Sequence, residues 1–452
     1  MRNTFVTPIL GLLSIALGVS ACDSATETGA SSPAASPMEV TWMVGVGPDR
    51  PMYERLLARF HELHPDIRVR PIWVPGSQYQ TKLKTLTAAG KPPDLFWTGD
   101  VWVAYQLPFL ADLTDLIARD AAEIELDDFY PELLAAGRYD GRQILLPRWF
   151  NVALLYYNRT LFDAAREPYP TADWTWDDYL AAAKRLTRRG PDGKVEVWGT
   201  SITTGWWGEW LIYVRQAGGD LFTDDVNRCL LDSPQAVAGM QFYLDKIYTH
   251  RVAPRPGFGP DQGFMSSKIA MELGGHTGNW INFNQHPGLD WDIQILPKGP
   301  VTRAGGEVAV DSVGVSRDSE HVEQAWQFVK FMSSKESVRL HVENGYLPVR
   351  KSVAQEMLMR PGRTARPRNV MAAYEQLKYA QRVPRSPDYL EIALEVIQPD
   401  VDRMLDKQLD VAATCRSAAE SANRFIRVLG ASRREVRGSS STVARAAPPP
   451  TR

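Results

Sequence analysis

An alternation of strand and helix patterns near the start of the chain constrains its fold more than any other feature. Residues 40–46 (VTWMVGV) form an apolar run typical of a buried strand, and apolar side chains then recur at helical spacing from Met52 to Leu63. Residues 67–73 alternate like a second strand, 79–90 are again helical, and 92–97 open a third strand at a Gly-Lys-Pro-Pro break. This order predicts an α/β fold with a parallel or mixed sheet, in which ligand sites lie outside the carboxyl ends of the strands.

Length and charge narrow the class of protein. The chain has 452 residues, 44% of them hydrophobic, which can bury a large core but is too long for one compact unit. We therefore expect two lobes. The 51 Lys and Arg residues nearly balance the 53 Asp and Glu residues, and the basic residues are scattered along the chain. Nucleic acid binding requires a concentrated basic surface, so we expect no nucleic acid partner.

The first residues resemble an export signal. Arg2 precedes an apolar run from Phe5 to Val19, which is shorter than the roughly 20 residues that a membrane-spanning helix needs. The stretch that ends this run, VSAC, resembles the lipobox of bacterial lipoproteins and predicts a signal peptide over 1–21 and lipidation of Cys22. Residues 22–38 have the Ser, Ala, Gly and Pro content of a flexible tether. We therefore expect an extracytoplasmic protein anchored to the cell membrane; the alternative is an ordinary secretory signal with an incidental cysteine.

The remaining cysteines and histidines predict no metal centre. Cys229 and Cys415 could pair in an oxidising compartment or remain buried free thiols, and the sequence leaves both open. Two histidines in HELH (61–64) could chelate a metal, but no third ligand is placed near them, and a solvated helix end is the commoner meaning.

Seven segments occur in an order that resembles a known family. They are ARFHELHPDIRVRPIWVP, LKTLTAAGKPPDLFW, GRQILLPRWFNVALLYYNRTLFDAA, WTWDDYLAAAKRLT, FMSSKIAMELGGHTGNW, WDIQILPKGP and AWQFVKFMSSKESVRLHVENGYLPVR. Together they are similar to the extracellular solute-binding proteins of ABC transporters, in the sugar-binding branch that includes maltose-binding protein. The resemblance covers about residues 39–430.

The resemblance implies two α/β lobes that close on a ligand by a hinge. It places the crossings between lobes near Pro147–Asn151, Pro297–Pro300 and Tyr346–Arg350. Lobe one would comprise 39–147 and 300–346, and lobe two 151–297 and 350–430. The tail 431–452 has little apolar content and is expected to be disordered. The family also implies a monomer without cofactor that delivers a sugar to the permease subunits of an ABC transporter.

Catalytic motifs are missing from the sequence. No GxSxG, HExxH or Walker A pattern occurs. A glycosidase pair such as Glu209 with Asp100 stays open from spacing alone. The resemblance implies binding without chemistry, so we expect no enzyme.

The site residues follow from the shape of a sugar, whose C–H faces pack on aromatic rings and whose hydroxyls need polar partners. The resemblance places seven tryptophans along the cleft: Trp97, Trp102, Trp149, Trp206, Trp207, Trp210 and Trp280. Trp42, Trp73, Trp291 and Trp326 have core patterns instead. The polar and glycine candidates are Asp49, Arg50, Gln78, Tyr79, Asp100, Asn151, Glu209, Gly274, Gly275, His276, Asp311, Ser312 and Arg350. For each polar residue a helix cap or a surface salt bridge is an equally good interpretation.

The stretch GWWGEW (205–210) has three indoles in five positions. Its glycines favour a loop that leads into a helix whose first turn carries Trp210. We expect at least one of the three indoles to be a platform for a sugar and Glu209 or its neighbours to bond hydroxyls; the alternative is three core indoles.

Two other functions stay open. A glycerophosphate ester could replace the sugar, with Arg50, Arg148 and Arg350 as phosphate clamps. From a different class, the chain could be a surface glycosidase or a lectin-like lipoprotein.

Overall fold

The computed structural model describes residues 36–47, 49–99, 103–257, 260–275, 279–381, 384, 386 and 388–445. The predicted export signal, Cys22 and most of the predicted tether lie outside the described residues, as do Asp100, Trp102 and His276.

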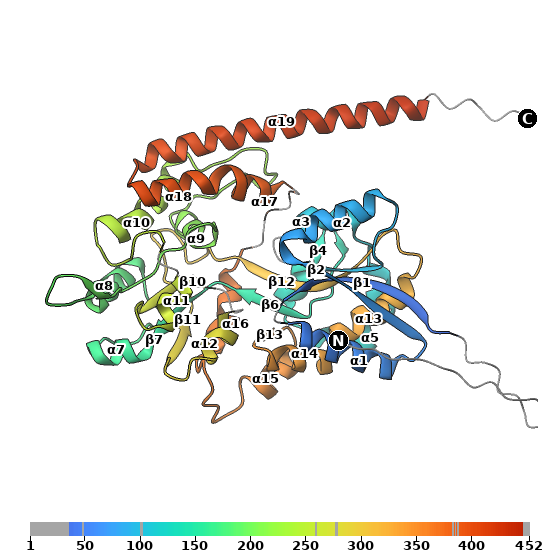
Figure 1. Cartoon of the computed structure of the whole chain (residues 1–452), viewed down its shortest axis with the longest axis horizontal. Coiled ribbons are helices and arrows are strands. Elements are labelled where there is room, and N and C mark those ends of the chain that lie inside the picture. The colour runs from blue at the N-terminus through green and yellow to red at the C-terminus, as the bar shows by residue number, and fades with distance from the viewer. Residues whose placement is uncertain are drawn as a thin grey trace, which may run out of the picture. The chain divides into compact units, whose positions relative to one another are not determined.

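A six-stranded mixed sheet organises the first part of the molecule. Its strands in spatial order are β13 (Leu347–Pro348), β6 (Trp149–Val152), β12 (Val308–Val315), β3 (Leu95–Gly99), β1 (Met38–Val46) and β2 (Ile67–Pro75). β1 lies parallel to β2 and β3, whereas β12 runs antiparallel to β3 and β6. Figure 1 labels β1, β2, β6, β12 and β13 of this sheet. The predicted order of strands and helices is confirmed, because α1 (Arg50–Leu63) follows β1 and α2 (Tyr79–Ala88) follows β2.

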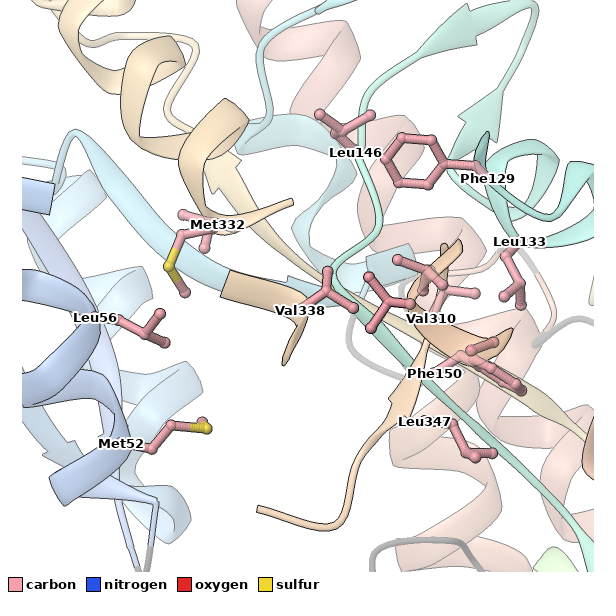
Figure 2. Close-up of a cluster of buried hydrophobic side chains, with 14 of the residues drawn as sticks. Met52, Leu56, Phe129, Leu133, Leu146, Phe150, Val310, Met332, Val338 and Leu347 are labelled. Carbon is pink, nitrogen blue, oxygen red and sulfur yellow. The ribbon is translucent and has the colours of Figure 1, made fainter. Parts of the chain in front are cut away.

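Helices pack on this sheet through their apolar faces. α1 buries Met52, Leu56 and Phe60, which are four residues apart and therefore lie on one face. Trp42 of β1 lies edge-on to Phe328 of α13 (Val322–Met332), with 5.1 Å between ring centroids. Figure 2 shows part of this core, which joins side chains of α1, β6, β12 and β13. Trp42 is fully buried, as its strand pattern predicts.

A three-stranded antiparallel sheet organises the second part. Its spatial order is β10 (Met271–Gly275), β7 (Leu154–Asn158) and β11 (Trp291–Gln294), and every residue of the central strand is buried. α9 (Gly208–Gln216) and α10 (Pro234–Tyr248) share one hydrophobic cluster with residues of β7 and β10. Trp280 and Phe283, both in α12 (Trp280–Asn284), pack against Trp291.

The chain passes between the two sheets at definable points. β6 ends at Val152 and β7 begins at Leu154, so Ala153 alone separates them. Residues 297–300 lie with helices of the second part, since Gln216 of α9 bonds the carbonyl oxygen of Pro297 and Trp176 bonds that of Lys298. The chain enters β12 only after Glu307, which bridges Gln381. We therefore propose that the second crossing lies near 306–308, beyond the predicted Pro297–Pro300.

Shorter elements complete the two parts. The remaining α-helices of the described residues up to residue 376 are α3 (Val103–Gln106), α4 (Thr114–Arg119), α5 (Ala121–Ile124), α6 (Pro131–Ala136), α7 (Arg159–Ala165), α8 (Trp176–Leu186), α11 (Pro260–Met265), α14 (Lys335–Glu343), α15 (Lys351–Met357) and α16 (Met371–Gln376). Two hairpins of short strands pair β4 (Arg138–Tyr139) with β5 (Arg142–Gln143) and β8 (Arg188–Arg189) with β9 (Val195–Val197).

The C-terminal segment is helical. α17 (Tyr389–Glu391) continues through a π-helix over Ile392–Ile397 into α18 (Gln398–Lys407), and α19 follows over Val411–Arg445. In Figure 1 α19 is the long red helix. Helical backbone through Arg445 differs from the expected disorder of 431–452. Residues 431–437 include Ala, Arg and Glu, which favour helix, whereas the run GSSST at 438–442 does not, and the sequence does not explain the helical backbone there. Residues 446–452 lie outside the described part.

The two described cysteines are not joined. Cys229 and Cys415 are buried free thiols, and burial raises the pKa of each thiol to about 12. No three His, Cys, Asp or Glu side chains of the described residues are grouped to hold a metal ion. None of the described helices has both the length and the apolar character that a membrane crossing requires.

Candidate functional site

Among the predicted site residues, Trp149 and Trp206 each keep some exposed surface and each stack on a second aromatic ring. We call Trp149 with Tyr346 the Trp149 pair, and Trp206 with Trp207 the Trp206 pair. The ring centroids are 4.4 Å apart in the Trp149 pair and 3.9 Å apart in the Trp206 pair. The rings of each pair are inclined by only 30° and 26°, so both are close to parallel stacks.

The register of the large sheet positions the Trp149 pair. Asp311 of β12 lies opposite Gly99, the last residue of β3, and Trp149 lies on the other side of Asp311. β1 ends nearby in the same parallel order and leads to Asp49 at the start of α1. These residues therefore occupy the carboxyl-end edge of the sheet, where ligand residues are expected.

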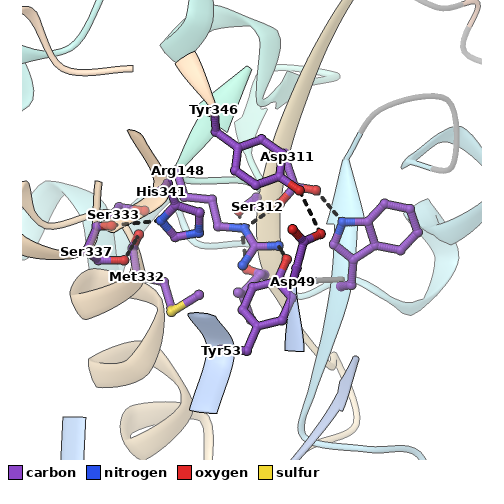
Figure 3. Close-up of polar contacts among 12 residues, drawn as sticks. Asp49, Tyr53, Arg148, Asp311, Ser312, Met332, Ser333, Ser337, His341 and Tyr346 are labelled. Atoms are coloured by element: carbon purple, nitrogen blue, oxygen red, sulfur yellow. Dashed lines mark hydrogen bonds and ion pairs between the residues drawn. The ribbon is translucent and has the colours of Figure 1, made fainter. Parts of the chain in front are cut away.

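A carboxylate holds the outer ring of the Trp149 pair. The Tyr346 hydroxyl donates to Asp49 Oδ2 at 2.6 Å (Figure 3). Burial, together with the neighbouring Tyr53 and Asp49, raises the pKa of the Tyr346 phenol, which therefore remains a protonated donor. Trp149 is 8% exposed and Tyr346 is half-buried, so part of the stack remains accessible.

A buried ion pair lies beneath the same edge. Arg148 and Asp311 are both fully buried, and the Arg148 Nε donates to Asp311 Oδ1. Trp97 Nε1 donates to the other carboxylate oxygen of Asp311, and Arg148 Nη2 donates to the Tyr53 hydroxyl at 3.1 Å. Both oxygens of Asp311 are thus bonded inside the protein, which favours a structural role over ligand contact.

A neutral histidine lies close enough to Arg148 to sense its charge. Nδ1 of the fully buried His341 lies 2.8 Å from the Ser337 carbonyl oxygen, so this nitrogen must carry the proton and donate. Burial, aided by the positive charge of Arg148, lowers the pKa of His341 to about 3. The ring is therefore uncharged at neutral pH.

Other predicted residues of the first part divide by exposure. Arg50 is exposed, with its guanidinium carbon 4.9 Å from the centroid of the Trp73 ring, and Gln78 is exposed as well. Asn151 is half-buried. In contrast, the Tyr79 hydroxyl donates to the Met43 carbonyl oxygen inside the core.

Two further candidates are occupied by internal bonds. The buried Ser312 hydroxyl donates to the Leu146 carbonyl oxygen at 2.7 Å. Arg350 is 3% exposed and donates to the carbonyl oxygens of Ser333 and Ile124 and to Asp128. This guanidinium bonds groups at the ends of α5 and α13, and we propose that the chain still belongs to the first part at the predicted third crossing.

The Trp206 pair lies where GWWGEW enters α9. The helix begins at Gly208, which confirms the expected loop followed by a helix with Trp210 in its first turn. Trp207 is fully buried and lies edge-on to Tyr389, with 5.4 Å between centroids, whereas Trp206 is half-buried. A side chain at Gly208 would meet the Trp206 indole, since a Cβ there would lie 2.5 Å from its Nε1. The glycine therefore lets the helix start against the stacked rings.

Glu209 and Trp210 point into the protein. The Glu209 carboxylate is 2% exposed and accepts from Lys246 Nζ at 2.7 Å and from the Tyr243 hydroxyl at 3.0 Å. Trp210 is fully buried and its Nε1 donates to Gln398. The geometry favours the core interpretation for both residues and leaves Trp206 as the accessible indole of the three.

The two glycines at the end of β10 and the tryptophan that begins α12 pack against other parts of the protein. A Cβ at Gly274 would lie 3.0 Å from Ile212 of α9, and one at Gly275 would lie 2.9 Å from the Tyr156 ring. Trp280 is 3% exposed, and its Nε1 donates to the Tyr156 hydroxyl at 2.9 Å. These three residues are therefore in close contact with other protein atoms.

Sequence reasoning missed the residues that hold the pairs in place. The sequence predicts Tyr346 only as the start of a crossing, and no local pattern indicates its bond to Asp49, which lies 297 residues away. Asp402, Gln398 and Tyr389 of the C-terminal helices contact GWWGEW, and their sequence offers no local signal of that contact.

Comparisons with known proteins agree with this architecture. The model of the bacterial extracellular solute-binding protein family matches residues 47–339. An arabinooligosaccharide-binding protein of Halalkalibacterium halodurans is 26% identical over 325 residues, which cover 67% of this chain and 69% of that protein. A periplasmic sn-glycerol-3-phosphate-binding protein of Brucella melitensis is 26% identical over 340 residues, with coverages of 70% and 76%.

Solved structures share the fold. An ABC substrate-binding protein from Listeria monocytogenes, in complex with cycloalternan, is 28% identical with a TM-score of 0.75, and the match covers 86% of this chain and 99% of that one. The maltose-bound MalE3 of T. maritima is 26% identical with a TM-score of 0.69, covering 86% and 100%. The predicted two-lobe fold of periplasmic sugar-binding proteins is thereby confirmed, and this chain belongs to the bacterial extracellular solute-binding protein family.

Proposed function

We propose that this protein captures a sugar, in particular an oligosaccharide or glycoside, and delivers it to the permease of an ABC importer. The observation that carries the proposal is the Trp206 pair, in which a fully buried indole supports a half-buried one at the entry to α9. An aromatic face fixed in this way suits the C–H face of a pyranose ring. Similarity to an arabinooligosaccharide-binding protein and to a cycloalternan complex supports the same ligand class.

The proposed contacts come from both parts of the molecule. Trp149 with Tyr346 would supply the second aromatic surface. Polar contacts would come from the exposed or half-buried candidates Asp49, Arg50, Gln78 and Asn151. Asp100 and Trp102 remain predictions. The hinge would bring the two parts together around the ligand, with the β6 to β7 passage at Ala153 as one crossing.

Two observations favour a sugar over a glycerophosphate ester. Arg148 is fully buried against Asp311, and Arg350 is 3% exposed and bonded to Asp128. Of the three arginines expected to clamp a phosphate, Arg50 is therefore the one with an exposed side chain. The relative that binds sn-glycerol-3-phosphate keeps this ester as the second candidate.

The glycosidase alternative is weakened by the position of Glu209. A general acid or nucleophile must reach the substrate, but both Glu209 oxygens bond to Lys246 and Tyr243 in the interior. We propose that the protein returns its ligand chemically unchanged, and chromatography of the ligand after incubation tests this point.

A thermal-shift screen tests the ligand class. Arabinooligosaccharides, maltotriose, cycloalternan and sn-glycerol-3-phosphate are each added to the purified protein. A true ligand at about 100 times its dissociation constant adds about 2.7 kcal/mol to stability. Stabilisation by a saccharide supports the proposal. Stabilisation by the phosphate ester alone overturns it in favour of the second candidate.

Anchoring is the last part of the proposal. We propose that Cys22 carries lipid and that the protein acts as a monomer on the outer face of the cell membrane, because acyl chains supply membrane affinity that a globular domain lacks. Cys22→Ala should move the protein out of the membrane fraction. Retention of that variant in membranes, released by detergent, would contradict the lipobox.

A further inference from the structure

The loop that carries Trp206 is held by a helix far away in the sequence. The backbone N–H of Gly205 donates to both carboxylate oxygens of Asp402, at 3.0 and 3.1 Å. The two residues are 197 positions apart, and Asp402 belongs to α18. Gly205 has a φ of +74°, a conformation that glycine adopts at little cost.

Two further contacts from the same C-terminal segment flank Trp206. Gln398, one turn before Asp402 in α18, accepts from Trp210 Nε1 at 3.0 Å and donates its own amide to Asp402 Oδ1 at 2.8 Å. The Tyr389 ring packs edge-on against Trp207. The chain is therefore fixed immediately before, immediately after and four residues after Trp206.

These contacts hold the neighbours of a half-buried ring. Trp206 stacks on Trp207, so the orientation of its face depends on where the loop holds the backbone at Gly205. A side chain that is ordered before the ligand arrives loses less freedom on binding, which raises affinity. The half-buried Asp402 has no place among the ligand contacts proposed above.

We propose that Asp402 is a positioning residue for ligand binding, which presets the Trp206 ring by holding the Gly205 N–H. The inference rests on the proposed role of Trp206 as a sugar platform. Asp402 would thus make α18 a determinant of ligand affinity, through the loop that carries Gly205 and Trp206.

Two readouts separate positioning from general stability. The first is binding calorimetry with maltotriose, and with an arabinooligosaccharide as second probe, in a double-mutant cycle of Asp402→Ala and Trp206→Ala. The second is the circular dichroism couplet of the stacked Trp206 and Trp207 indoles in the ligand-free protein. Asp406→Ala, at an exposed position in the same helix, is the matched control.

The expected result is specific to the pair. Asp402→Ala should weaken binding by about tenfold in the wild-type background, the size expected for losing one pre-ordered side chain, and by less than about twofold when Trp206 is already alanine. It should also diminish the indole couplet, while Asp406→Ala leaves both unchanged. Asp402→Asn keeps one acceptor oxygen for Gly205 and should retain most of the affinity and the couplet.

Other outcomes overturn the inference or the proposed function separately. Equal losses of affinity from Asp402→Ala in both backgrounds, or an unchanged couplet, would overturn the positioning role. If Trp206→Ala itself leaves saccharide binding intact, the proposed platform fails, whatever Asp402 does. Should Asp402→Ala melt too low for titration at room temperature, both readouts are taken below its melting temperature, where an unchanged couplet still overturns the inference.

Discussion

The two aromatic pairs reach a similar arrangement by different physical means. In the Trp149 pair the anchoring carboxylate, Asp49, bonds the hydroxyl of the outer ring itself, and a buried ion pair lies beneath it. In the Trp206 pair the carboxylate of Asp402 bonds the backbone before the outer ring, and the inner ring rests in an apolar cluster. The first pair thus depends on electrostatics and the second on burial and backbone conformation.

The two pairs should therefore respond differently to pH and to changes in side-chain volume. Buried charges are costly when one partner is lost, and their energies respond to pH. Apolar packing responds to volume rather than to protonation. We therefore expect a fall in pH to act mainly on the Trp149 pair.

The largest effect is expected from breaking the buried ion pair. Arg148→Ala leaves the fully buried Asp311 carboxylate without its cation, which should destabilise the protein by about 3–5 kcal/mol. Denaturant unfolding of the ligand-free protein measures this. The control is Arg50→Ala, which removes an exposed pair with Glu54 and should cost at most about 1 kcal/mol. Similar losses in the two variants would contradict the electrostatic account of the Trp149 pair.

The next effect is a pH dependence that belongs to the same region. Because the pKa of His341 falls from 6.5 to about 3 on folding, the unfolded chain binds more protons between these values. This contribution to stability is complete above about pH 6.5 and is lost progressively as the pH falls toward 3. Between pH 7 and pH 4, the free energy of unfolding should fall less steeply with decreasing pH in His341→Gln than in the wild type. An unchanged slope would show that His341 does not titrate as its burial requires.

A smaller effect is expected from the outer ring of the Trp149 pair. Tyr346→Phe keeps the stack but removes the hydroxyl that donates to Asp49, at a cost of about 0.5–1.5 kcal/mol in stability. Saccharide binding should weaken as well, because the ring is no longer fixed. Asp49→Asn keeps an acceptor for the Tyr346 hydroxyl and serves as the matched variant. If Tyr346→Phe is as stable as the wild type, the bond does not hold the ring.

Local periodicity was sufficient to predict the strands and helices around β1 to β3 and the loop into α9. It could not assign Glu209, whose partner Lys246 lies 37 residues later, nor Asp402, which is 197 residues from Gly205. Tryptophan is a residue type that sugar sites use, yet the indole of Trp280 donates to the Tyr156 hydroxyl in the core. Whether a tryptophan or a carboxylate meets solvent depends on tertiary neighbours, which spacing along one chain does not encode.

The central claim is that Trp206 offers its face to a saccharide while Trp207 supports it from the core. Titration calorimetry of a stabilising saccharide into Trp206→Ala, with ligand-free melting of the same sample, tests it most directly. The account predicts a loss of about 2 kcal/mol or more in binding energy with little change in ligand-free stability. Trp207→Ala, the matched variant, should instead cost about 3–5 kcal/mol of folding stability. Undiminished saccharide binding by folded Trp206→Ala would contradict the account.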